Sequence, residues 1–479
     1  MIAGGVIGSL GLAALIVLQQ RGVRLLALGL TVVSGAILVV TLRPEGNDAL
    51  LAAAGVVGAL AAVGLGAVFV RWPWLLPMAA LACAPARVPV KVGGEEASLL
   101  LPLYLVVVGG VVALAWELWR GDTSSRELGP LGWPLAAFLA WSGVSLLWSD
   151  GPRQGAVSLA AFVLPFGLLA LMVARMPWQR RWLKALTVEL IAMAAVFAAI
   201  GVYQWATRDV FWNPKVIVSN AYAPFFRVNS VFWDPSIYGR FLVVAIVVAL
   251  VVALYGVRPD WIYAGVAIVG LWVGLLFSFS QSSFVALIAG VVGAIALSWP
   301  RRWVVALAGA AVVLLAAGFV VPSVRAEILD NTDRATGNRS SLVREGTRIA
   351  VDHPVGGVGL GGFKRAYGER VGFRAADPAR AASHNTPVTV AAETGLPGLL
   401  LFAWLVVAAL WLPFRRVSRS FAGRASLCFG LALVTILVHS LFYNAFFEDP
   451  MSWGLLGLTA LGYAWRTSTR TSRARSNGK

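Results

Sequence analysis

Apolar segments of about twenty residues follow one another along most of the chain. Each is long enough to cross a bilayer as a helix, which needs about 20 apolar residues. They lie at 2–19, 25–42, 49–70, 97–116, 130–148, 155–176, 183–206, 241–256, 262–279, 282–298, 303–321, 395–413, 425–447 and 450–465. The pattern predicts an all-α polytopic membrane protein with about 14 transmembrane helices.

Two long polar gaps divide these segments into groups. We expect N-terminal transmembrane helices, a first loop, central helices, a long loop with short helices, C-terminal helices and a basic tail, at 1–206, 207–240, 241–321, 322–394, 395–465 and 466–479. The stretch from Trp74 to Val92 contains three prolines and one arginine. It predicts a short span, a re-entrant piece or a kinked extension of its neighbour.

Composition agrees with a membrane protein: 59% of the residues are hydrophobic and 13% are charged, against about 25% charged in soluble domains. The net charge of +17 would suggest nucleic acid in a soluble protein. Here the basic residues lie mostly between apolar segments and in the tail, and no nucleic-acid-binding module is present. Cys83 and Cys428 lie far apart in or beside apolar segments, which predicts neither a disulfide nor a metal thiolate. Residues 1–19 lack a basic leader and are expected to form the first helix.

Lysine and arginine in short loops predict the orientation, because they favour the cytoplasmic side. The tail and the basic pairs at 415–416, 301–302 and 180–181 are expected to be cytoplasmic. Both long loops then lie outside. The N-terminal orientation stays open, since Arg21 and Arg24 favour the cytoplasm and thus an odd number of helices.

The two external loops are themselves basic. Arg227 lies in an aromatic-rich stretch, and Arg240 closes the first loop. Arg339 precedes an expected amphipathic helix that runs to about residue 352, on which Arg344 and Arg348 share one face. Most such arginines simply solvate a surface, but a guanidinium also matches phosphate oxygens in a two-pronged manner. A subset near the membrane is therefore a candidate pyrophosphate clamp.

The glycine-rich segment 353–363 resembles a phosphate-binding loop but lacks the strand-to-helix context and the lysine-serine ending. We favour a structural role in which the glycines end a helix and let the backbone approach a neighbour.

The chain has three histidines. His439 lies in an apolar helix and is expected to be a satisfied core residue. His353 precedes a proline at a helix end. His384 follows the long basic loop near the membrane, where an imidazole could take a proton from a hydroxyl at neutral pH.

The surroundings of His384 resemble bacterial O-antigen ligases. His384 and Asn385 are followed by nine residues and then by Gly395 and Gly398, which matches the pattern of that family. Arg339 before a glycine-rich loop is similar to a second family element, and Arg227 with residues 232–239 to a third. Residues 444–450 resemble the family's short acidic element. Ser230 and Asp234 depart from the arginine element, which usually has glycine and proline or asparagine there. The resemblance covers roughly 200–465, the core of the O-antigen ligase and polymerase superfamily.

The resemblance implies a metal-independent glycosyltransferase of the GT-C type that needs no cofactor. It would move a glycan from an undecaprenyl-pyrophosphate carrier to a hydroxyl of a glycan, lipid or protein, at the periplasmic face of the bacterial cytoplasmic membrane. Arg227 and Arg339 would neutralise the diphosphate, and His384 would act as general base or position the acceptor. Further substrate contacts are expected from Arg240, Arg344, Arg348 and Asn385.

Two other functions stay open. One is a polymerase, or a ligase to protein hydroxyls, of the same superfamily. The other is a flippase or transporter of lipid-linked sugars. Transporters place ionisable residues within their spans, whereas these segments are nearly free of charge apart from Glu189, which favours the enzyme.

Overall fold

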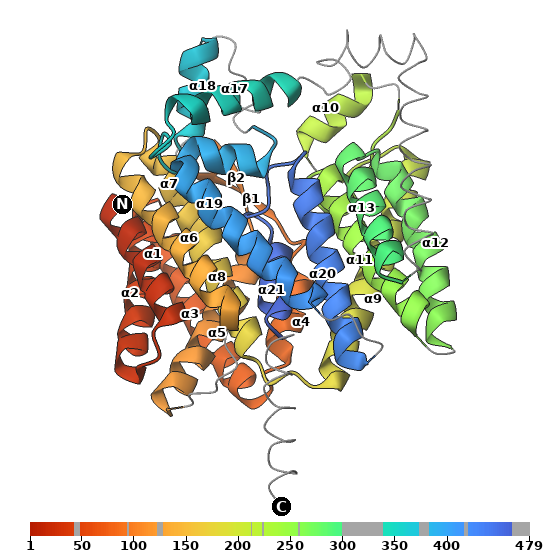
Figure 1. Cartoon of the computed structure of the whole chain (residues 1–479), viewed down its shortest axis with the longest axis horizontal. Helices are drawn as coiled ribbons and strands as arrows, with labels where there is room; N and C mark the ends of the chain where they lie inside the picture. Colours follow the sequence, from red (N-terminus) through yellow and green to blue (C-terminus); the bar gives the residue numbers. More distant parts are fainter. Residues whose placement is uncertain are drawn as a thin grey trace, which may run out of the picture.

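A computed structural model of the chain describes residues 1–42, 48–92, 95–121, 128–211, 213–222, 225–256, 259–298, 339–372, 383–415 and 420–461. These residues form a bundle of long apolar helices (Figure 1). Within the described part, ten helices are long and apolar enough to cross a membrane. Every predicted apolar segment except 303–321, which lies outside the described residues, corresponds to a helix. The predicted all-α polytopic fold is confirmed.

The first half of the chain forms one side of the bundle (red to yellow in Figure 1). Its helices are α1 (Ile2–Val17), α2 (Arg21–Thr41), α3 (Asp48–Arg71), α4 (Leu75–Cys83), α5 (Leu101–Trp119), α6 (Gly132–Val144), α7 (Pro152–Ser158) and α8 (Leu164–Arg175). Short turns flank α6, at Gly129–Leu131 and Ser145–Trp148. A π-helical turn, Leu159–Val163, joins α7 to α8.

The second half supplies the other side and the centre. The side consists of α9 (Arg180–Thr207), α11 (Pro235–Tyr255), α12 (Asp260–Ser278) and α13 (Gln281–Ser298). Between the two sides lie α19 (Thr386–Phe414), α20 (Phe421–Ser440) and α21 (Pro450–Thr459) (Figure 1). Helix α11 is buried without interruption from Tyr238 to Ala249, so it forms the middle of the core. Its N-terminus is fixed by Asp234, whose carboxylate accepts a hydrogen bond from the backbone N–H of Ser236 at 2.7 Å.

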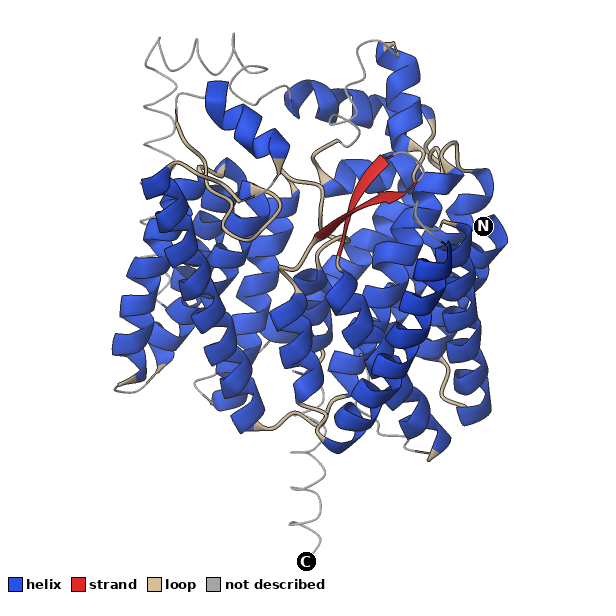
Figure 2. Cartoon of the chain, turned by 180° about the vertical axis from the view of Figure 1, so that it is seen from behind, coloured by secondary structure: helices blue, strands red, loops and turns tan. Residues whose placement is uncertain are grey.

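One end of the bundle carries the elements that do not run through it, and we call it the loop face. It bears α10 (Pro214–Tyr222), α17 (Arg339–Asp352) and α18 (Phe363–Val371) (Figure 1). An antiparallel hairpin of β1 (Val88–Val92) and β2 (Glu95–Leu99) lies beneath them (Figure 2).

The hydrophobic pattern of the sequence did not predict this hairpin. The pattern predicted a helix over 97–116, but residues 97–99 belong to β2 and helix α5 begins only at Leu101. For Trp74–Val92 it left several helical forms open, whereas the structure has the short helix α4 followed by β1. Residues 88–92 alternate valine with proline or lysine, which is the two-residue period of a strand. The prolines and the brevity of the segment hid that period.

The predicted apolar segment 425–447 is also too long. Helix α20 ends at Ser440, and residues 441–449 form an irregular connection to α21. Phe446 and Phe447 of this connection pack against Phe402 of α19, with ring centroids 5.7 and 5.5 Å apart. Hydropathy does not separate a buried aromatic loop from the end of a helix.

Candidate active site

A charged cluster surrounds the connection 441–449 near the loop face. We call it the polar cluster, and its members are Arg87, Asp234, Arg240, Tyr443, Glu448 and Asp449. Its firmest contact joins Arg240 of α11 to Asp449, with Nε and Oδ2 2.7 Å apart and side chains only 2% and 8% exposed. Removing two charges from water is costly, so a buried pair of this kind needs close geometry and further partners.

Arg240 has donors left over. Its Nη1 and Nη2 atoms are buried and have no hydrogen-bond partner among the residues that the structure describes. Buried donors are nearly always satisfied, so an orphaned pair requires an explanation. An anionic ligand with several oxygens would satisfy both nitrogens.

Arg87 and Glu448 form another part of the polar cluster. Nη2 of Arg87 donates to the backbone carbonyl oxygen of Glu448 at 3.2 Å. The Glu448 side chain keeps solvent contact, yet protein surrounds it closely enough for burial to raise its pKa, which Arg87 and Arg240 lower. Glu448 therefore lies near the guanidinium groups of Arg87 and Arg240.

Tyr443 links the polar cluster to two histidines. Its ring centroid lies 6.3 Å from that of His384 and 5.7 Å from that of His439. Burial raises the pKa of Tyr443, and the nearby carboxylate of Asp234 raises it further. The phenol is therefore protonated at neutral pH and can donate a hydrogen bond.

His439 connects this group to a serine-rich turn between α12 and α13. Nε2 of His439 lies 3.0 Å from Oγ of Ser282, and Ser280 contacts both Ser282 and Ser283 through its hydroxyl, at 3.2 and 2.8 Å. His439 is a buried core residue, as predicted, and its Nε2 atom is within hydrogen-bonding distance of a serine hydroxyl. It also places the turn next to Tyr443.

Arg227 lies on the other side of the same turn. Its Nε donates to the carbonyl oxygen of Ser278 at 3.2 Å. Asn220 of α10 fixes its backbone, since Oδ1 accepts from the N–H of Arg227 at 3.0 Å and Nδ2 donates to its carbonyl at 2.9 Å. Arg227 and His384 are thus joined by a chain of contacts through the serine turn, His439 and Tyr443.

The family motif ties α19 to the connection 441–449. Oδ1 of Asn385 accepts from the N–H of Val388 at 3.0 Å and so caps α19, while Nδ2 donates to the carbonyl of Leu441 at 3.0 Å. Thr386 hydroxyl donates to Oδ1 of Asn444 at 3.1 Å. The amide of Asn385, which we expected to contact substrate, is used in these structural bonds.

Gly395 marks the other end of the motif, where α19 is interrupted. It adopts φ +69° and ψ −172°, and a Cβ there would lie 2.4 Å from the carbonyl oxygen of Val355. Only glycine fits such a position without strain. At about 1.5 Å per residue, the ten steps from Asn385 to Gly395 place the cap about 15 Å from this break.

The glycine-rich segment packs into that break. Val358 N–H donates to the carbonyl of Ala392 at 2.9 Å, and Leu396 N–H donates to that of Pro354 at 2.7 Å. A Cβ on Gly357, which has φ +64°, would collide with the backbone of Glu393. The geometry agrees with the structural role that we favoured for these glycines.

Helix α17 begins at Arg339 itself, which the sequence had placed just before the helix, and ends at Asp352 as predicted. The side chain of Arg339 lies outside the described part of the structure. Arg344 and Arg348 are exposed, and Arg348 pairs with Glu345 at 2.7 Å. The opposite face of α17 buries Leu342 and Ile349 in a small core with residues of α18. Of the predicted site residues, Arg240 belongs to the polar cluster, and His384 and Asn385 contact the connection 441–449. Arg227 contacts the serine-rich turn, and Arg344 and Arg348 lie on the outer face of α17.

Sequence reasoning missed Arg87, Tyr443 and Glu448 as members of the site. Arg87 lies in the proline-rich stretch whose structure stayed open, and Tyr443 lies inside the segment 425–447 that was assigned to a helix. Glu448 belongs to the acidic element 444–450, which was given no role. The sequence feature that could have identified these residues is the acidic pair Glu448-Asp449 directly before a buried helix. An unpaired charge is not tolerated there, so the pair indicates basic partners nearby. Among the described residues, no group of three or more His, Cys, Asp or Glu side chains is arranged to hold a metal ion.

Comparison with known families agrees with this geometry. Residues 264–403 match the family model described as O-antigen ligase. The match contains His384, Asn385 and Gly395, and ends before the connection 441–449. A comparison with curated proteins gives no match. The match over 264–403 confirms the resemblance of this chain to the O-antigen ligase superfamily, whose members are glycosyltransferase-like membrane enzymes.

Proposed function

We propose that this protein transfers a glycan from an undecaprenyl-pyrophosphate carrier to an acceptor hydroxyl at the outer face of the cytoplasmic membrane. The observation that carries the proposal is the buried guanidinium of Arg240, with two unpartnered nitrogens, near the histidine of the family motif. A diphosphate is an anion with enough oxygens to satisfy such a group.

In the proposed reaction, the acceptor oxygen attacks the anomeric carbon of the glycan while the bond from that carbon to the diphosphate oxygen breaks. The electron pair of that bond leaves with the diphosphate, which remains on the polyprenyl chain. Arg240 and Arg227, with Arg339 at the start of α17, stabilise the negative charge as it develops. Arg87 lies close enough to Glu448 to join them.

His384 takes the proton of the acceptor hydroxyl in this scheme. An imidazole suits the task because its ordinary pKa lies near neutral pH. Tyr443, whose raised pKa keeps the phenol protonated, orients the imidazole or the acceptor. Arg344 and Arg348 are further contacts on sequence grounds alone, because both side chains are exposed on α17.

A polymerase that joins lipid-linked repeats and a ligase to protein hydroxyls use the same attack on the same donor. They differ from an O-antigen ligase in the acceptor, and the polar cluster recognises the donor. A flippase would move the donor without breaking the sugar–phosphate bond.

The test is release of undecaprenyl pyrophosphate from a lipid-linked glycan by purified protein in lipid nanodiscs. We expect release to depend on an added hydroxyl acceptor and to fall at least 100-fold in His384→Ala and in Arg227→Ala, the usual range for loss of a general base or a charge-stabilising group. The matched control is Arg365→Ala, because Arg365 of α18 is 63% exposed and pairs with Glu369 on the same face. Transport of the intact donor without release would establish the flippase and overturn the proposal.

A further inference from the structure

An apolar cavity lies directly beyond the buried pair of Arg240 and Asp449. It offers about 110 Å³ of space to a ligand. Residues of six helices line it, namely α4, α8, α9, α11, α20 and α21, and nearly all of them are apolar. An apolar cavity of about 150 Å³ can bind benzene, so this space can hold a short stretch of hydrocarbon.

The cavity continues the polar cluster along α11. Arg240, Val244 and Val248 are spaced by four residues and so share one face of the helix, and both valines line the cavity. At 1.5 Å per residue they lie about 6 and 12 Å from Arg240 along the axis. This face of α11 therefore carries a charged side chain at Arg240 and apolar side chains at Val244 and Val248.

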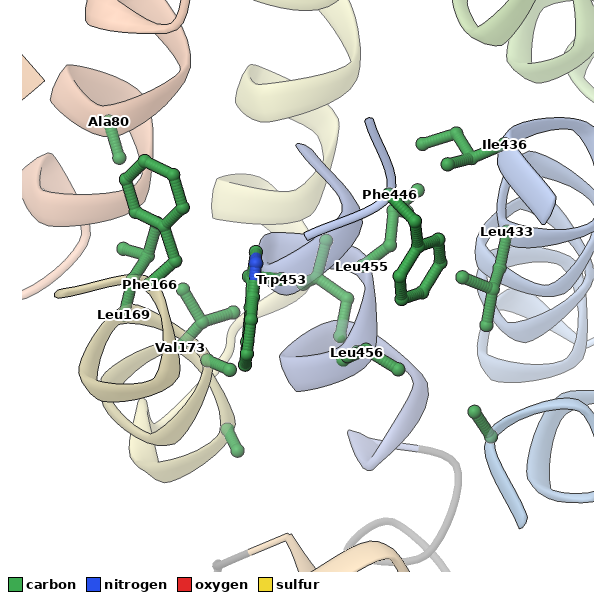
Figure 3. Close-up of a cluster of buried hydrophobic side chains, with 14 of the residues drawn as sticks. Ala80, Phe166, Leu169, Val173, Leu433, Ile436, Phe446, Trp453, Leu455 and Leu456 are labelled. Atoms are coloured by element: carbon green, nitrogen blue, oxygen red, sulfur yellow. The ribbon is translucent and has the colours of Figure 1, made fainter. Parts of the chain in front are cut away.

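Helix α21 repeats this arrangement. Asp449 caps it by accepting a hydrogen bond from the N–H of Met451 at 2.9 Å, and Met451, Gly454 and Leu458 then line the cavity. Trp453 of the same helix lies beside Leu169 and Val173 of α8 (Figure 3), which also line the cavity. The lining of the cavity thus starts at Pro450, the residue after Asp449, and follows α21.

The far end of the cavity lies near the start of α9. Leu183 and Leu186 of α9 line it, less than two turns from Arg180, whose guanidinium packs over the ring of Phe421 at the start of α20. The cavity therefore runs from the polar cluster toward the end of the bundle opposite the loop face. A site with an anion-binding head and a long apolar body matches an amphiphile with a phosphate head and one hydrocarbon tail.

We propose that this cavity binds the proximal isoprenoid units of the polyprenyl diphosphate donor and so holds its diphosphate at Arg240. The inference rests on the proposed function, because it takes the head group to be a diphosphate. The surrounding lipid tails are as apolar as the cavity wall. Selectivity therefore comes from the charged head together with close packing of the tail, rather than from hydrophobicity alone.

Gly454 offers a direct way to fill the cavity. A Cβ at this position meets no atom within 4 Å, so the side chain of Gly454→Leu enters open space. Gly270 of α12 is the matched control, because its Cβ also meets nothing within 4 Å and it does not line the cavity. Both changes place the same leucine on a membrane helix.

The experiment measures binding of undecaprenyl pyrophosphate and of methyl diphosphate, which has the head but no tail, by native mass spectrometry in nanodiscs. We expect Gly454→Leu to weaken binding of the long-chain lipid about tenfold, because the packed tail is displaced. Binding of methyl diphosphate stays unchanged, and Gly270→Leu affects neither ligand. Equal long-chain affinity in the two variants would overturn the assignment of the cavity. If neither ligand binds to the unchanged protein, the proposed function itself fails.

A second measurement does not depend on filling the cavity. Photo-leucine at Leu458, which lines the cavity, replaces leucine with a group of nearly the same shape. We expect it to crosslink undecaprenyl pyrophosphate, whereas photo-leucine at Leu400 of α19, which is 60% exposed, crosslinks bulk phospholipid. Crosslinking of phospholipid at Leu458 that undecaprenyl pyrophosphate does not displace would refute the proposal.

Discussion

Arg240 and Asp449 pair at 2.7 Å across 209 positions of sequence (449 − 240), and both side chains are almost completely buried. The pair joins the most buried helix, α11, to the start of α21. It also sets the boundary between the polar cluster and the apolar cavity beyond it. Both proposals made above depend on this contact.

Loss of one partner of this pair is expected to destabilise the protein. Asp449→Ala leaves the guanidinium of Arg240 buried without its carboxylate and removes the cap of α21, so we expect a loss of about 3–5 kcal/mol. Thermal unfolding in detergent measures it. Glu369→Ala breaks an exposed pair with Arg365 and should cost about 0–1 kcal/mol. Equal shifts in the two variants would contradict this account of the buried pair.

Gly395→Ala is expected to disturb the motif without touching a charged group. The positive φ and the close carbonyl of Val355 strain any side chain, at a cost of about 1–3 kcal/mol, and the glycine-rich segment must shift. We expect a lower unfolding temperature and reduced glycan transfer. Gly270→Ala, with open space around its Cβ, serves as the control and should be neutral or slightly stabilising. A normal unfolding temperature for Gly395→Ala would show that the break in α19 is not required.

The two hydrogen bonds of the Asn385 side chain, to Val388 and to Leu441, can be tested separately. Asn385→Asp keeps an acceptor for the N–H of Val388 but places an anion against the carbonyl of Leu441, whereas Asn385→Ala removes both bonds. We therefore expect the aspartate variant to retain the helix cap, worth about 1 kcal/mol, and yet to lose transfer activity because the connection 441–449 is released from α19. Unfolding temperature and kcat, measured together, distinguish these effects. Full activity in the aspartate variant would rule out the tie to Leu441.

The free energy of unfolding should fall as the pH rises through the pKa of the Glu448 carboxyl. Burial raises the pKa of this carboxyl in the folded protein, so folding favours the protonated form. The stabilisation is complete below the ordinary pKa of glutamate, about 4.3, and is lost as the pH passes the raised value. We expect the unfolding of Glu448→Gln to depend less on pH above about 4.3, the ordinary glutamate pKa, than that of the unchanged protein. A steeper dependence in the variant would reverse the sign and refute the account.

The sequence by itself determined the helical membrane fold, because hydrophobic length is a local property that each segment carries alone. It also determined the position of the motif, since Asn385 as a cap and Gly395 at positive φ are requirements of the local backbone. The tertiary structure alone decided that Arg240 meets Asp449, that Arg87 reaches Glu448, and that the connection 441–449 is a loop and not the end of α20. These contacts join helices far apart in sequence, and a hydrophobic pattern shows which faces are buried but not against which partners. The cavity beyond Arg240 has the same origin, because it exists only where six helices leave space between them.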